Sequence, residues 1–200
     1  VQESLYADEV PEACAMDEEG RVALGLKSGE VAIWYPVEDE VTEYQIVDNR
    51  ITDCVIDAKN KVLIAGDDHG NVGALLDGRK QSSIQKVLES GVHKLRINYE
   101  KHNLIAIGNN HIEFMMYDAD KIMRARSLTG SCMDVFPDAD LLVISHEDRV
   151  RLIDSMTFSV MTELGGGMYY NGCSIDGDML CLWGDERVEL YHINTQEQLA

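Results

Sequence analysis

Residues 21–35 read RVALGLKSGEVAIWY, and this stretch predicts a β-hairpin. Residues 22–26 form an unbroken apolar run, which is typical of a strand buried on both faces. After the turn at Lys27, Ser28 and Gly29, apolar side chains alternate at Val31 and Ile33, as expected for a second strand.

The same strand–turn–strand phrase recurs four more times along the chain. Its five copies start at Val22, Val62, Leu104, Leu141 and Met179, so that successive starts lie 40, 42, 37 and 38 residues apart. A period near 40 residues with this content is typical of propellers and repeat arrays.

Each repeat also has room for an outer pair of strands. A first strand precedes each phrase, at residues 12–17, 51–57, 93–99, 131–136 and 171–176. A more polar fourth strand follows four of the phrases, at residues 41–47, 82–89, 123–128 and 159–164. No window keeps apolar residues at helical spacing over three turns, so we expect no long helix.

The phrase GEVAIW, with Gly29 and Trp34, resembles the Gly-x-Val-x-Ile/Val-Trp ending of a WD40 repeat. Asp77, Asp118 and Asp154 stand where the Asp of that family's Trp-Asp pair follows. The dipeptides Gly-His and Trp-Asp do not occur in the chain, so the repeats are degenerate. The resemblance covers essentially the whole chain and implies a WD40-like β-propeller.

We therefore expect an all-β fold, a β-propeller of about five four-stranded WD40-like blades that forms a single domain over residues 1–200. The expected blades cover residues 12–47, 51–89, 92–128, 130–164 and 168–200. A strand at residues 4–10 is expected to close the ring as the fourth strand of the last blade. The C-terminal EQLA competes for that place, and the alternative is that the chain is part of a larger propeller.

The charge excludes some classes of partner. The chain has 36 acidic and 17 basic residues and a net charge of -19, a field that repels nucleic acid. We expect protein partners instead, including basic ones, although acidity often serves only solubility. No run of about 18 apolar residues exists, so no membrane span is expected. The N-terminal VQESLYADEV has no apolar stretch typical of a secretory signal.

The cysteines are expected to be buried, free thiols. Cys14, Cys54 and Cys173 occupy the same place in their first strands, Cys132 lies on the same face, and Cys181 lies in a second strand. No Cys-x-x-Cys pair occurs, and equivalent places in different blades are too far apart for a disulfide or a shared zinc ion. This pattern favours a reducing compartment, the cytoplasm or the nucleus.

In a WD40-like arrangement, the second-to-third turns lie on one rim, here called the top rim. The first-to-second and third-to-fourth turns lie on the opposite, bottom rim. The top-rim candidates for partner contact are Asp67, Asp68, His69, Asn110, His111, His146 and Asp185. The bottom-rim candidates are acidic: Asp17, Glu18, Glu19, Glu38, Asp39 and Glu40. Solvated turn residues are the simpler interpretation of both sets. For the histidines, pH-dependent binding is a further alternative.

Catalytic signatures are missing from the sequence. It has no Gly-x-Ser-x-Gly elbow, P-loop, HExxH or Gly-x-Gly-x-x-Gly. A glycosidase needs two carboxylates at a central cleft, for which Asp53 and Asp134 are the candidates in the first strands. We expect no enzyme activity, no cofactor and no metal site.

The fold resemblance implies a non-catalytic protein–protein interaction scaffold or adaptor that binds partners on the propeller rims and works within a larger complex. One alternative is an acidic chaperone or escort for a basic client, such as a histone or a ribosomal protein. The other is a glycan-binding or glycoside-hydrolysing five-bladed propeller.

Overall fold

The computed structural model describes residues 9–57, 61–76, 84–98, 101–117, 121–129, 135–138, 141–146, 148–154, 157, 159–166, 169–195 and 197–199. The regular structure in these ranges is β-strand, which confirms the expected all-β class. Within them, no helix has the length and the apolar character needed to cross a membrane.

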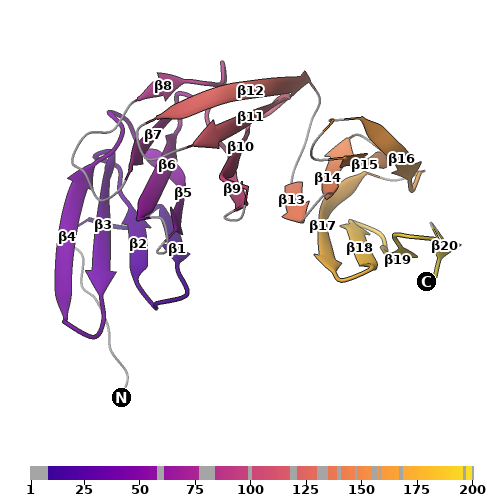
Figure 1. Ribbon diagram of the computed structural model, residues 1–200, viewed down its shortest axis with the longest axis horizontal. Helices are drawn as coiled ribbons and strands as arrows, with labels where there is room; N and C mark the ends of the chain where they lie inside the picture. Colours follow the sequence, from indigo (N-terminus) through magenta and orange to yellow (C-terminus); the bar gives the residue numbers. More distant parts are fainter. Residues whose placement is uncertain are drawn as a thin grey trace. The chain divides into compact units, whose positions relative to one another are not determined.

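The strands form five four-stranded sheets, and Figure 1 shows that each sheet occupies one continuous interval of the colour scale. The first sheet contains β1 (Ala13–Met16), β2 (Val22–Gly25), β3 (Glu30–Tyr35) and β4 (Glu40–Gln45). The second contains β5 (Ile51–Asp57), β6 (Val62–Asp67), β7 (Asn71–Leu75) and β8 (Gln85–Lys86). The third contains β9 (Lys94–Asn98), β10 (Asn103–Ile107), β11 (His111–Tyr117) and β12 (Ile122–Thr129). The fourth contains β13 (Val135–Asp138), β14 (Leu141–His146), β15 (Arg149–Asp154) and β16 (Val160–Leu164). The fifth contains β17 (Tyr170–Asp176), β18 (Met179–Gly184), β19 (Val188–His192) and β20 (Glu197–Gln198).

The contacts divide the chain into two compact units, Val1–Gly108 with Glu113–Ser127, and Asn109–Ile112 with Leu128–Ala200. Within each unit the apolar core lies between consecutive sheets. In the first unit, Ala23 and Ile33 of the first sheet pack with Ile56 and Leu63 of the second. In the second unit, Leu152 of the fourth sheet packs in the same way with residues of the fifth. Each of the buried Ile and Leu side chains contributes about 1.5–3 kcal/mol when it is fully buried.

The predicted hairpin of residues 21–35 is the β2–β3 pair, in which Val22 lies opposite Trp34 and Gly25 opposite Val31. Its turn depends on Gly29, whose φ is +84° and whose N–H donates to Leu26 O at 3.3 Å. Gly29 O in turn accepts the N–H groups of Ile46 and Val47 at 3.1 and 3.2 Å.

The β6–β7 turn repeats this geometry around Gly70, at a φ of +83°. Its N–H donates to Asp67 O at 3.2 Å, and its carbonyl accepts from Val87 and Leu88. A Cβ at Gly70 would collide with the backbone oxygens of Leu88 and Ser90, so only glycine fits there. Because Val87 and Leu88 turn their N–H groups to Gly70, β8 ends at Lys86, whereas the predicted strand continued to residue 89; residues 82 and 83 of that prediction lie outside the described ranges.

Two further strand predictions fall partly on residues outside the described ranges. For the first strand of the fourth sheet, predicted at residues 131–136, residues 131–134 lie outside these ranges, and the described part is β13, Val135–Asp138. The place beside β19, predicted for residues 4–10, is taken by β20, with Tyr191 opposite Gln198. Residues 4–8 lie outside the described ranges, and residues 9 and 10 form no strand.

The cysteine prediction holds for two positions and is wrong for one. Cys54 and Cys173 are buried, at 2% and 0% exposure, whereas Cys14 is exposed. Ala13 and Ala15 pack against the core between the first two sheets, so alternation along β1 turns Cys14 to the other face. Cys181 is half-buried, and Cys132 lies outside the described ranges.

Candidate functional site

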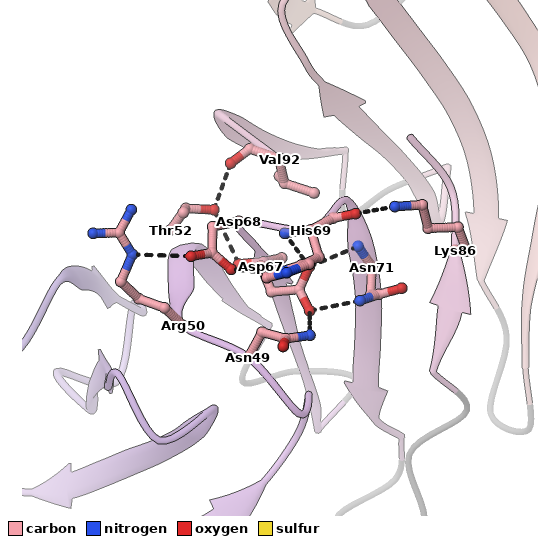
Figure 2. A network of polar contacts seen from close by, with 10 residues as sticks. Asn49, Arg50, Thr52, Asp67, Asp68, His69, Asn71, Lys86 and Val92 are labelled. Atoms are coloured by element: carbon pink, nitrogen blue, oxygen red, sulfur yellow. Dashed lines mark hydrogen bonds and ion pairs between the residues drawn. The ribbon is translucent and has the colours of Figure 1, made fainter. Parts of the chain in front are cut away.

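Figure 2 shows a network of polar contacts around the turn between β6 and β7. Its members come from the β4–β5 connection, the β6–β7 turn and β8, all within the first unit. We call it the β6–β7 turn cluster, and it consists of Asn49, Arg50, Asp67, Asp68, His69, Asn71 and Lys86.

Asp67 is the buried residue of the cluster, and it accepts hydrogen bonds from three of the other members. Its side chain is 0% exposed, and its Oδ1 accepts the backbone N–H groups of His69 and Asn71 at 3.0 and 2.8 Å. Its Oδ2 accepts the side-chain amides of Asn49 and Asn71 at 2.9 and 2.7 Å. Four donors therefore compensate for the burial of this carboxylate. The contact with Asn49 also ties the β4–β5 connection to the β6–β7 turn.

Three charged or titratable side chains stand on the exposed side of this turn. His69 Nδ1 lies 2.8 Å from Asp68 Oδ1, and Arg50 Nε lies 3.3 Å from Asp68 Oδ2. The side chains of His69 and Arg50 are 65% and 48% exposed, so both groups remain available to a partner. Asp68 therefore orients an imidazole and a guanidinium at the surface, one at each oxygen of its carboxylate.

The cluster continues along the outer strands of the second and third sheets. Lys86 Nζ donates to His69 O, and Arg124 Nη2 of β12 donates to Lys86 O. The side-chain amide of Gln85 donates to Ile122 O at 2.8 Å. These bonds join β8 to β12 and extend the exposed positive charge from Arg50 towards Arg124.

On β5, directly after Arg50 of the cluster, two residues connect the second sheet to the third. Thr52 Oγ1 contacts Gly66 O at 3.1 Å and also Val92 O. Asp53 Oδ2 accepts the N–H of Leu95 on β9 at 2.7 Å. Burial raises the pKa of Asp53, and the backbone hydrogen bonds that it accepts partly oppose this shift. Asp53 thus links two first strands, and the other glycosidase candidate, Asp134, lies outside the described ranges.

The structure corrects the prediction for two candidate contact residues. Asp67 is buried, and so is the Asp17 side chain, at 3% exposure. Asp17 accepts the N–H groups of Glu19 and Arg21 at 2.9 and 3.0 Å, and Arg21 Nε at 2.7 Å. Each Asp accepts hydrogen bonds from the backbone N–H groups of the second and fourth residues after it, so neither carboxylate is presented at the surface.

The other predicted contact residues fall on turns and strand ends. Asp68 and His69 belong to the cluster described above, Asn110 is exposed before β11, and His111 is half-buried as its first residue. His146 ends β14. The acidic bottom-rim residues other than Asp17 are exposed: Glu18, Glu19, Glu38, Asp39 and Glu40.

Asp185 lies on the β18–β19 turn, where it accepts the side-chain amide of Asn171. Close by in sequence, the buried carboxylate of Glu189 accepts the hydroxyls of Tyr170 and Tyr191 at 2.8 and 2.9 Å and pairs with Arg187 Nε at 2.7 Å. Burial, followed by the hydrogen bond to Glu189, raises the pKa of Tyr191. Glu189 is thus occupied by internal contacts of the fifth sheet.

Sequence reasoning missed Asn49, Arg50, Asn71 and Lys86. The pattern Asp-x-x-Gly, present at Asp17 and at Asp67, could have identified the buried carboxylates, because Asp opens and Gly closes this type of turn. In the described ranges, no three His, Cys, Asp or Glu side chains are grouped so that they could hold a metal ion.

Comparisons with known proteins concern the fold. The sequence matches no protein-family model and no curated protein. The computationally designed propeller Ika8 has a similar structure, with a TM-score of 0.79 and 14% identity over 95% of this chain and 60% of that chain. A WD40-containing chain of the Mitotic Checkpoint Complex is also similar, with a TM-score of 0.76 and 14% identity over 94% of this chain and 62% of that chain.

The chain thus spans about 60% of the length of the two structures that it matches. In this chain, consecutive four-stranded antiparallel sheets follow one another along the sequence, as expected for propeller blades. The chain has the WD40-like β-propeller fold.

Proposed function

We propose that the chain is a non-catalytic protein–protein interaction scaffold and that the β6–β7 turn cluster contacts its partner. The observation that supports this most is the Arg50–Asp68–His69 group, which is exposed above a buried carboxylate with four hydrogen bonds. A contact surface that is already ordered costs less entropy on binding. Arginine is also enriched among the residues that dominate binding energy at protein interfaces.

The position of His69 supports a contact role, because its Nδ1 lies 2.8 Å from Asp68 Oδ1 while its side chain is 65% exposed. The thiols of Cys14, Cys54 and Cys181, which form no disulfide, support our proposal of a reducing compartment, the cytoplasm or the nucleus.

A photo-crosslinking experiment tests the position of the contact. A photoreactive phenylalanine analogue at position 69 should capture a partner that the same analogue at position 38, on the exposed β3–β4 turn, does not capture. The captured protein is then purified and titrated calorimetrically. We expect Arg50→Ala to weaken binding at least about thirtyfold, since truncating a residue that dominates an interface costs about 2 kcal/mol or more. Equal capture from both positions, or an unchanged affinity, would contradict the proposal.

The exposed acids of the first sheet favour one second candidate, an escort for a basic client. The acids Glu18, Glu19, Glu38 and Asp39 on the β1–β2 and β3–β4 turns, and Glu40 as the first residue of β4, are all exposed, and the two turns lie at the same end of this antiparallel sheet. Capture from position 38 alone would favour this candidate. Its affinity for the client must then fall steeply with salt, because exposed charges are screened within about 8 Å at physiological ionic strength.

A further inference from the structure

A pocket of about 160 Å³ lies between the first and second sheets. It is at the start of β6, whereas the β6–β7 turn cluster is at the other end of that strand. Its lining residues are Arg21, Ile33, Tyr35, Tyr44, Ile56, Lys61, Val62, Leu63 and Leu75.

The pocket has an apolar floor and a polar rim. Its five aliphatic residues, Ile33, Ile56, Val62, Leu63 and Leu75, are each at most 5% exposed and form the floor. The rim consists of Tyr35 and Tyr44 of the first sheet, Arg21 before β2, and Lys61 before β6. The rim thus combines residues of two sheets that are up to 40 positions apart in the sequence.

The size of the pocket limits what it can hold. A cavity of about 150 Å³ accommodates a single benzene ring, whereas pockets for whole small molecules usually have about 300–1,000 Å³. This pocket therefore has room for one aromatic ring or one branched aliphatic side chain. A ligand with more atoms must continue outside the opening, as a polypeptide does on either side of an anchoring side chain.

The rim offers hydrogen-bond donors. Arg21 is already bound to Asp17 and, at 3.5 Å, to Glu19. Lys61 is exposed and has no ion-pair partner among the described residues, and the same ranges hold no hydrogen-bond partner for the hydroxyls of Tyr35 and Tyr44. Burial raises the pKa of Tyr35, which keeps its phenol protonated and able to donate. An ammonium group and two hydroxyls together suit a carboxylate.

We propose that this pocket binds a segment of a partner protein, with one aromatic or branched aliphatic side chain on the floor and a neighbouring carboxylate at Lys61. It is a second contact site, independent of the β6–β7 turn cluster. The experiments below measure binding at the pocket alone, so a negative result there would leave the contact proposed for the β6–β7 turn cluster untouched, and the reverse also holds.

The test uses 3-phenylpropionate, which carries one ring and one carboxylate, and its neutral amide as the matched control. All five floor residues carry methyl groups, so methyl NMR spectra report directly on the pocket. We expect these methyl signals to shift and saturate with a dissociation constant in the low millimolar range, as for fragments of this size. The amide should bind about twofold to fivefold more weakly, the range for one partly exposed ion pair. No saturation up to about 20 mM, or equal binding of the amide, would overturn the proposal.

Lys61→Asn separates the role of the ammonium from folding. Lys61 has a φ of +53°, a conformation in which Asn is enriched, so the variant should be at least as stable as the natural chain. It should nevertheless lose the preference for the propionate over the amide. His102→Asn is the matched control, because His102 has the same φ of +53° in the third sheet and does not line the pocket. A preference that survives in Lys61→Asn, or is lost in His102→Asn, would contradict the assignment of Lys61.

A dipeptide distinguishes a protein segment from a free metabolite. Acetyl-Phe-Glu amide should bind at least as tightly as 3-phenylpropionate and more tightly than acetyl-Phe-Gln amide, because its backbone can leave through the open side of the pocket. If the propionate binds and acetyl-Phe-Glu amide does not, the pocket takes a small carboxylate instead, and the protein segment is the wrong occupant.

Discussion

Replacing Asp67 with Asn changes one buried atom and tests how the β6–β7 turn cluster is held. The remaining oxygen of the side chain can still accept the backbone N–H groups of His69 and Asn71, as Oδ1 now does. The new amide group then points at the amides of Asn49 and Asn71, where Oδ2 accepts two hydrogen bonds. Asp67→Asn therefore replaces two charge-assisted bonds by two contacts between donors.

The magnitude follows from these two bonds. A hydrogen bond to a charged group contributes about 1.5–3 kcal/mol, so losing two costs about 3–6 kcal/mol. Asn49 and Asn71 are only half-buried and can turn towards water, and the variant no longer buries a charge. Both effects favour the lower end, about 3 kcal/mol. In a chain of this size this lowers Tm by about 6–12 °C.

Urea denaturation of the natural chain and three variants measures the effect. Asp68→Asn is the matched control, because its carboxylate is partly exposed and its ion pairs should contribute at most about 1 kcal/mol. The double variant Asn49→Asp/Asp67→Asn restores a donor facing a carboxylate and should recover part of the loss. If Asp67→Asn is no more destabilising than Asp68→Asn, or if the double variant recovers nothing, Asp67 does not hold the cluster as described.

Three further predictions concern backbone strain and titration. Gly70→Ala should cost at least about 2 kcal/mol in urea denaturation, because a positive φ alone costs a non-glycine residue about 1–2 kcal/mol and a collision with backbone is added. Gly20→Ala, at a φ of +81° with no atom within 4 Å of the new Cβ, should show only the smaller cost; equal losses would contradict this. Burial raises the pKa of Cys54 to about 12, so an aromatic disulfide reagent should label the exposed Cys14 in the native state and Cys54 only on unfolding. Burial raises the pKa of Asp53 in the folded state, so its contribution to stability is present below the unfolded value near 3.8 and is lost as the pH rises through the folded pKa. Asp53→Asn removes that dependence while keeping an oxygen acceptor, so its free energy of unfolding relative to the natural chain should increase with pH across this window; a constant difference would refute the assignment.

The repeat arrangement could be predicted because its causes are local. Alternation of side chains, apolar runs and glycine turns act over a few residues, and the turn at Gly29 recurs at Gly70 with nearly the same φ. The errors lie where a competing contact decides the outcome. The outer strand β8 ends before the predicted residue 89 because the N–H groups of Val87 and Leu88 bind Gly70 O, and Cys14 is exposed because Ala13 and Ala15 take the core face of β1.

The candidate sites were only partly predictable, for a related reason. Asp68 and His69 could be placed on a turn by sequence alone, but whether a turn carboxylate faces water depends on how many donors surround it. Asp17 and Asp67 were predicted as contact residues and are instead buried acceptors, one holding a guanidinium and the other two amides. Arg50 was not singled out because its partner Asp68 belongs to a different strand connection.

The sequence by itself determined the all-β class, the five repeats and the hairpin at residues 21–35, since each depends on periodicity and turn chemistry within one short segment. Only the tertiary structure decided which polar groups are used internally and which are offered to a partner. Lys61 and Tyr35 come together at one pocket because two sheets pack face to face. Such packing depends on contacts between distant segments, which no local pattern contains.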